Sequence, residues 1–85
     1  MLGLSASESL LIESRLALSD ALRARRAKLG WTQTRLAKAI GSSQSRVAKM
    51  EAGDKTVSID LLVSTLGCLG ATCRELSRIL AQHTG

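Results

Sequence analysis

Apolar residues recur at helical spacing along this chain of 85 residues, and small or turn-forming residues separate the apolar stretches. In the first stretch, residues 6–29, apolar side chains three, four or seven apart predict one long helix that Gly30 ends. A capping box formed by Ser5 and Glu8 would start this helix. Its apolar face carries Leu11, Leu18, Leu22 and Leu29.

Residues 32–53, with the sequence TQTRLAKAIGSSQSRVAKMEAG, predict two short helices joined by a tight turn at Gly41. Glycine suits this turn because it accepts a left-handed backbone conformation at little cost. The apolar residues expected to face each other are Leu36, Ala37 and Ile40 on the first helix and Val47 and Met50 on the second. The second helix keeps polar side chains outside: Gln44, Ser45, Arg46 and Lys49.

The two short helices each follow a residue that can cap them. Thr32 and Ser43 are the predicted caps, because a side-chain oxygen there can accept a hydrogen bond from a free backbone N–H group of the first turn. Trp31 precedes the first of these caps and is expected to pack on Leu36 as a hydrophobic staple.

A fourth helix is predicted over residues 59–69 with Ser58 as its cap, and a fifth after a capping box of Thr72 and Glu75. Gly67 lies inside the fourth helix, where glycine costs about 1 kcal/mol relative to alanine, so we expect another helix to pack closely there. The residues expected to face inward are Ile59, Leu62, Leu66 and Leu69, then Leu76, Ile79 and Leu80. The chain is therefore expected to be all-α, with five helices.

Length and composition fit one small helical domain. Hydrophobic residues make up 45% of the chain, yet there is no Phe or Tyr and one Trp, so the core must consist of Leu, Ile, Val and Ala. No apolar run reaches the length of a membrane span, and the first residues lack the features of a secretory signal. A cytoplasmic protein with no membrane partner is expected.

Nothing in the sequence predicts a cofactor or a catalytic site. Cys68, Cys73 and His83 do not have the spacing of metal ligands, so no metal is expected. The two cysteines are expected to be buried free thiols rather than a redox pair. No motif assembles a nucleophile with a base, a pair of carboxylates or a phosphate-binding glycine loop, so the protein is not expected to be an enzyme.

The positive charge is concentrated in one part of the chain. The net charge is −2 over residues 1–20, +7 over residues 21–55 and zero over residues 56–85. Charge alone leaves a solvated basic face and a nucleic-acid surface equally open. Because the basic segment coincides with the two short helices, nucleic acid becomes the favoured partner.

The stretch LGWTQTRLAKAIGSSQSRVAKMEAG resembles the lambda-repressor-like, Cro/Xre-type helix-turn-helix family. The matching marks, in chain order, are Thr32-Gln33, Leu36-Ala37, Ile40-Gly41, Ser43-Gln44-Ser45, Val47 and Glu51-x-Gly53. Ser42 departs from the pattern, since an apolar residue is more common after the turn glycine. The resemblance covers roughly residues 17–82. It implies a five-helix DNA-binding domain over residues 17–85, preceded by a helical extension over residues 1–16.

The resemblance also implies which side chains contact double-stranded DNA. The third helix would lie in the major groove, and its base-reading residues would be Gln44, Ser45, Arg46 and Lys49, with Arg46 able to reach either a base or a phosphate. Helix starts hold phosphates well, and the expected phosphate contacts are Gln33, Ser43, Lys55 and Ser58. Arg26 and Glu51 match a structural ion pair that is common in this family.

The implied function is transcriptional regulation, most simply repression by a homodimer on a palindromic operator. One branch of such proteins consists of antitoxins, which repress their own operon and bind a small toxin protein. The alternatives are a phage- or plasmid-type repressor without a toxin, and an interaction module that keeps the fold without binding DNA.

An apolar stripe near the start of the chain is expected to form the dimer interface. Its members are Leu4, Leu11 and Leu18, spaced seven apart, with Ile12 and Leu16 widening it. An exposed apolar strip usually marks an interface. The competing possibility is dimerisation through the fifth helix, by way of Leu76, Ile79 and Leu80.

Overall fold

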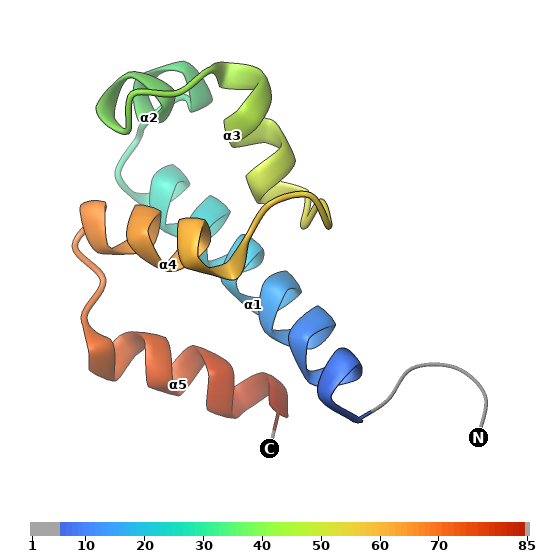
Figure 1. The fold of residues 1–85 in the computed structure, drawn as a ribbon. Coiled ribbons are helices and arrows are strands. Elements are labelled where there is room, and N and C mark those ends of the chain that lie inside the picture. The colour runs from blue at the N-terminus through green and yellow to red at the C-terminus, as the bar shows by residue number, and fades with distance from the viewer. Residues whose placement is uncertain (1–5, 85) are drawn as a thin grey trace.

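A computed structural model describes residues 6–84 of the chain, with side chains described for residues 10–81. The part that it describes is all-helical and confirms the expected five helices. They are α1 (Ala6–Lys28), α2 (Gln33–Ala39), α3 (Gln44–Glu51), α4 (Ile59–Cys68) and α5 (Cys73–Thr84) (Figure 1). The predicted capping box of Ser5 and Glu8 lies outside the described side chains. Among the described residues, no helix combines the length and apolar character needed to cross a membrane.

The long helix α1 is the element on which the others assemble. Helices α4 and α5 pack on α1, α2 packs with α3, and α3 also contacts α1. Figure 1 shows α2 and α3 at one end of the molecule, α5 at the other and α4 between them. This arrangement keeps the two short helices of the predicted DNA-binding motif away from α5.

The core lies where α1, α4 and the α2–α3 pair meet. Its buried residues are Leu18, Leu22, Leu36, Ala37, Val47, Met50, Val57, Leu62, Leu66 and Leu69. Ile40 and Trp31 pack against this cluster while remaining partly exposed. The apolar faces predicted for the second, third and fourth helices are thus confirmed. Each fully buried Val, Leu or Met side chain stabilises the fold by roughly 1.5–3 kcal/mol relative to an exposed one.

The predicted helix caps are confirmed. Thr32 accepts a hydrogen bond from the backbone N–H of Arg35 at 3.0 Å, and Ser43 accepts one from Arg46 at 3.2 Å. In the turn between these helices Gly41 has a φ of +66°, the left-handed conformation that the sequence predicts there. Local chemistry therefore fixes where α2 ends and α3 begins.

Arg25 ties α1 to the turn between α4 and α5. Its guanidinium donates to the carbonyl oxygen of Leu69 at 3.3 Å and forms an ion pair with Glu75. The hydroxyl of Thr72 accepts from the backbone N–H of Glu75 at 3.2 Å, so the Thr72 half of the predicted capping box forms. The Glu75 carboxylate instead binds Arg25, which fixes the start of α5 against α1.

Two predictions about the outer surface are wrong. Gly67 is exposed, and a Cβ atom built on it meets nothing within 4 Å, so no helix packs closely there. Cys68 and Cys73 are free thiols, as expected, but they are exposed rather than buried. The reason is the same for Gly67 and Cys68: the buried side of α4 passes through Leu66, and the next two positions turn outward.

The predicted apolar stripe is wrong at Leu18, which is fully buried in the subunit's own core. Ala17 and Leu18 are the first buried residues among the described side chains of α1, and a spacing of seven residues cannot reveal where burial begins. Leu11, Ile12 and Leu16 are exposed, as expected for the stripe. Leu4 lies outside the described residues.

The buried hydroxyl of Ser19 has no hydrogen-bond partner among the described residues. An unpaired buried polar group costs about 1–3 kcal/mol. We therefore expect Ser19→Ala to raise the free energy of unfolding by about 1 kcal/mol, measured by urea denaturation. Ser64→Ala, at an exposed position of α4, is the matched control for helix propensity. Equal effects of the two substitutions would contradict this account of Ser19.

Candidate nucleic-acid interface

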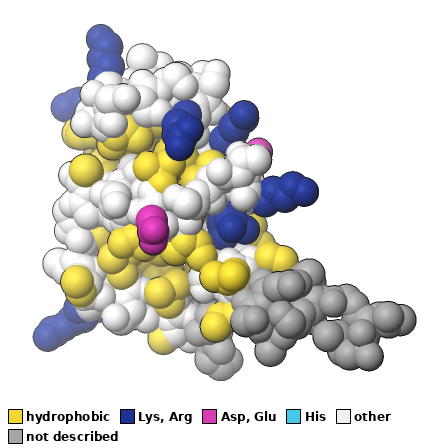
Figure 2. Space-filling model, viewed as in Figure 1, with side chains coloured by type: hydrophobic (Ala, Val, Ile, Leu, Met, Phe, Trp, Pro, Cys, Tyr) yellow, Lys and Arg dark blue, Asp and Glu magenta, His cyan; other side chains and the backbone are white. Residues whose placement is uncertain are grey.

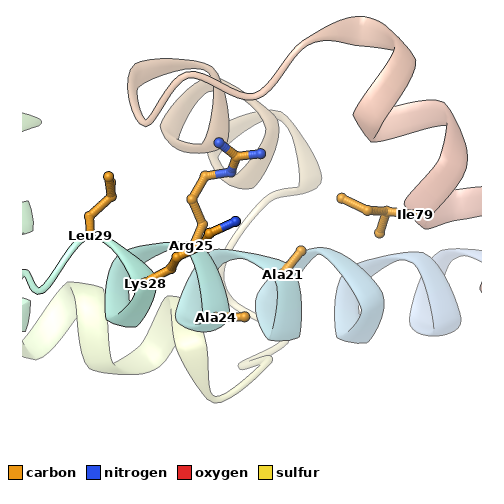
Figure 3. Close-up of a pocket in the computed structure, with 6 residues that line it drawn as sticks. All are labelled: Ala21, Ala24, Arg25, Lys28, Leu29 and Ile79. Atoms are coloured by element: carbon orange, nitrogen blue, oxygen red, sulfur yellow. The ribbon is translucent and has the colours of Figure 1, made fainter.

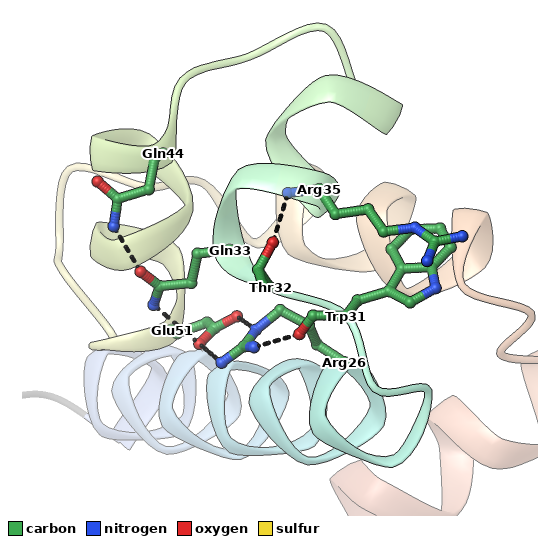
Figure 4. Close-up of polar contacts among 7 residues, drawn as sticks. All are labelled: Arg26, Trp31, Thr32, Gln33, Arg35, Gln44 and Glu51. Atoms are coloured by element: carbon green, nitrogen blue, oxygen red, sulfur yellow. Dashed lines mark hydrogen bonds and ion pairs between the residues drawn. The ribbon is translucent and has the colours of Figure 1, made fainter.

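A chain of polar contacts connects the inside of the domain to the start of α3. Arg26 on α1 binds both carboxylate oxygens of Glu51, the second at 2.9 Å. The amide nitrogen of Gln33 donates to Glu51 at 3.2 Å, and the amide nitrogen of Gln44 donates to Gln33 at 2.6 Å. Figure 4 shows these side chains following one another from α1 to the first residue of α3. The ion pair inferred from the resemblance is therefore present, and two glutamines extend it.

The inner end of this series of polar contacts is largely shielded from water. The side chain of Glu51 is 4% exposed and that of Arg26 is 16% exposed. Arg26 also donates to the carbonyl oxygen of Trp31 at 2.7 Å. The hydrogen bond with Glu51 raises the pKa of Arg26 above its ordinary value, against the opposing effect of burial. Both charges are thus compensated, which a buried ion pair requires to be tolerated.

The outer end of the chain is accessible. Gln44 is exposed and its side chain makes only the bond to Gln33 within the described residues, which leaves its amide oxygen and one N–H unused. An amide with a free donor and a free acceptor can form the paired hydrogen bonds by which glutamine recognises adenine. The bond to Gln33 restricts the rotation of Gln44 before any ligand arrives, which lowers the entropy cost of binding.

The remaining predicted base-reading residues, Ser45, Arg46 and Lys49, are exposed on α3. A hollow of about 270 Å³ lies between α3 and the loop that follows it. Its lining residues are Ser43, Ser45, Arg46, Lys49, Thr56 and Val57. The fold thereby brings the predicted cap Ser43 together with three predicted base-reading residues. Figure 2 shows Lys and Arg side chains concentrated over the α2–α3 end of the face in view.

Lys55 and Ser58 are exposed in the loop before α4, on either side of the two loop residues that line this hollow. The hydroxyl of Ser58 accepts from the backbone N–H of Leu61 at 3.1 Å, so it caps α4. Gln33, also a predicted phosphate contact, is half-buried and hydrogen-bonded to Glu51 and Gln44. The predicted phosphate-binding residues therefore border the predicted base-reading surface.

Asp54 orders the loop that carries Lys55. Its carboxylate accepts hydrogen bonds from the backbone N–H of Thr56 at 2.8 Å and from the Thr56 hydroxyl at 2.6 Å. These bonds hold the pKa of Asp54 below its ordinary value, because they favour the charged carboxylate. We did not predict this turn from the sequence, although an aspartate two residues before a threonine is its usual signal.

Two further contacts of this region were also not predicted. The bond between Gln33 and Gln44 joins the first residues of α2 and α3, and it depends on how the two helices pack. The second contact joins Arg35 to Trp31, with the guanidinium of Arg35 4.4 Å from the centre of the Trp31 ring. This cation–π contact holds Trp31 at the start of α2, on the side away from Gln44 (Figure 4).

Comparison with known proteins agrees with this geometry. Residues 22–79, more than half of the chain, match the helix-turn-helix family of the Cro/C1 type. No curated protein and no solved structure gives a significant match. The matched region contains the Arg26–Glu51 pair, both glutamines and the whole exposed face of α3. The chain therefore belongs to the Cro/C1-type helix-turn-helix family of DNA-binding transcription regulators.

Proposed function

We propose that the protein is a sequence-specific repressor that binds a palindromic DNA operator as a homodimer. In this proposal α3 enters the major groove, Gln44, Ser45 and Lys49 contact base edges, and Arg46 contacts a base or a phosphate. The major groove is wide enough for an α-helix and displays a different pattern of donors and acceptors for each base pair.

The observation that carries this proposal is the anchored position of Gln44. An exposed glutamine on an ordinary helix surface has no need of a partner, whereas Gln44 is connected through Gln33 to the buried Glu51. Such a connection costs conformational freedom and covers no apolar surface. It is useful if the orientation of the Gln44 amide matters for recognition.

The proposed phosphate contacts surround this base-reading surface. The start of α2 around Gln33 and the start of α4 around Ser58 offer backbone N–H groups and the positive end of a helix dipole. Lys55 adds a charge between α3 and α4 that no described carboxylate pairs with. These groups would fix how deeply α3 sits in the groove.

The small number of base pairs that one such domain can contact supports the proposed homodimer. A single short helix reads only a few base pairs, and two-fold symmetric dimers place two reading helices about 34 Å apart on one side of the duplex. Exposed Leu11, Ile12 and Leu16 on α1 support an interface in this region. Repression would result from occupation of the promoter by the dimer.

An antitoxin that represses its own operon and binds a small toxin protein is a narrower form of the same proposal. It draws on the resemblance and on the apolar residues that α1 leaves exposed. The alternatives are a repressor without a toxin and an interaction module without DNA binding. A mobility shift of random-sequence duplex DNA that weakens with salt would support DNA binding, and its absence at low salt would favour the interaction module.

Lys55→Ala is expected to weaken binding to all duplexes alike. Loss of one phosphate contact should reduce the slope of log affinity against log salt concentration by about one for each protomer. The measurement is a fluorescence titration of a labelled duplex at several salt concentrations. Arg74→Ala, which removes an exposed positive charge from α5, is the matched control. Equal slopes for the two variants would argue against a phosphate contact at Lys55.

A further inference from the structure

An apolar groove lies on the side of the molecule where α1 meets α5. It has a volume of about 480 Å³ and is lined by Ala21, Ala24, Arg25, Lys28, Leu29 and Ile79. Four of these residues lie in the second half of α1, Leu29 directly follows the helix, and Ile79 faces them from α5 (Figure 3). The floor is made of alanine and aliphatic side chains, so the groove suits another apolar segment rather than a polar ligand.

Two positively charged residues, Arg25 and Lys28, lie at the rim of this groove. Arg25 is already bound to Glu75 and to the carbonyl oxygen of Leu69. Lys28 is exposed, and none of the ion pairs among the described residues involves it. An occupant that carries a carboxylate beside apolar side chains would therefore match the groove in both shape and charge.

The first half of α1 has this chemistry. Leu10, Leu11 and Ile12 are 48%, 52% and 39% exposed, which is unusual for three consecutive large aliphatic residues. Glu13 follows them and is exposed as well. Residues 1–20 carry a net charge of −2, whereas residues 21–55 carry +7. We call residues 10–13 the apolar-acidic segment.

A subunit cannot place this segment in its own groove. The segment and the groove lie on one continuous helix, α1, which runs from Ala6 to Lys28. At 1.5 Å per residue, Leu11 is about 20 Å along the helix axis from Ala24. Only another molecule can bring the segment and the groove together.

We propose that in the homodimer the apolar-acidic segment of each protomer occupies the groove between α1 and α5 of its partner. Two antiparallel α1 helices related by a two-fold axis make this contact twice, because each protomer supplies one segment and one groove. Leu10 and Leu11 cover the apolar floor and Glu13 approaches the partner's rim at Lys28, because these three residues share one side of the helix. Ile12 lies on the opposite side of the helix. This inference rests on the proposed homodimer and specifies its interface.

Disulfide cross-linking tests the contact between protomers. Leu10→Cys and Ala24→Cys, two positions on the same side of α1, are prepared as separate proteins, each in a Cys68→Ser, Cys73→Ser background because both native thiols are exposed. A disulfide requires Cα atoms within about 7 Å, so the two new cysteines can be joined only if the segment of one chain reaches the groove of another. After mixing, subunit exchange and mild oxidation, we expect the heterodimer carrying one copy of each variant to be the main cross-linked species.

A pair of matched substitutions tests the groove without cysteines. Ala24→Glu places a carboxylate in the groove, where it repels Glu13 and competes for Lys28. Ala27→Glu places the same group on the same helix, at an exposed position outside the lining of the groove. In sedimentation experiments we expect Ala24→Glu to raise the dimer dissociation constant at least about tenfold and Ala27→Glu to change it little.

Each other outcome would overturn the inference. If the wild type dimerises but the two cysteine variants give no cross-linked heterodimer, the interface lies elsewhere, for example between α5 helices. The same conclusion holds if Ala24→Glu and Ala27→Glu change the dimer dissociation constant equally. A wild-type protein that stays monomeric at high concentration would exclude a second copy as the occupant. Duplex binding by the same samples tests the proposed function separately, because a protein that shifts duplex DNA but fails the cross-linking test refutes only this interface.

Discussion

Glu51→Ala is expected to lower the free energy of unfolding by about 3 kcal/mol, the largest stability effect that we predict for this protein. Removal of one partner from a buried ion pair leaves the other charge without compensation, at a cost of about 3–5 kcal/mol. Arg26 would be left in this state, with its side chain 16% exposed. The guanidinium would keep its bond to the Trp31 carbonyl, which places the expected loss at the lower end of the range.

The protein contains an exposed ion pair that serves as a control for the buried one. Arg23 and Asp20 lie 3.4 Å apart on α1, with side chains 61% and 63% exposed. Exposed pairs contribute about 0–1 kcal/mol, so Asp20→Ala should change the stability little. Urea denaturation of the two variants measures the difference directly. If Glu51→Ala cost no more than Asp20→Ala, the pair would not hold α1 and α3 together.

Gln44→Ala is expected to weaken binding to the preferred DNA site by about 1–3 kcal/mol, the range for loss of one paired contact to a base. Its stability should remain near that of the wild type because Gln44 is exposed. Affinity for random duplex DNA should also change little, since phosphate contacts dominate that binding. Titration of labelled specific and random duplexes measures both effects.

Gln33 provides an internal control for this prediction. If Gln33 orients Gln44 as well as contacting a phosphate, Gln33→Ala should weaken specific binding. The two substitutions together should then cost less than the sum of their separate effects, because residues in one hydrogen-bond network are coupled. Strict additivity would mean that the 2.6 Å bond between the glutamines does not matter for recognition.

Features determined by neighbouring residues were predictable from the sequence. Thr32 and Ser43 cap their helices, and Gly41 forms the turn, because these roles depend on a few adjacent positions. The wrong predictions concern which residues are buried by helices that are distant in the sequence. Leu18 is buried and Gly67 exposed, and the sequence around neither residue reveals which side the rest of the fold protects.

The candidate site was predictable to a similar degree. The pairing of Arg26 with Glu51 was inferred from a family resemblance, since the two residues are 25 positions apart. The exposed side chains of α3 followed from helical periodicity. The link between Gln33 and Gln44 depends on the packing of α2 against α3, so it became visible only in the folded structure.

Selection of bound sequences from a random duplex pool, with wild-type protein and Gln44→Ala in parallel, tests the central claim most directly. If α3 reads the major groove, the wild type should enrich a two-fold symmetric site with half-sites about 34 Å apart. Gln44→Ala should enrich the same site with relaxed preference at one base position in each half. An enriched site that is identical for both proteins, or no enrichment by the wild type, would contradict the assignment of α3 as the reading helix.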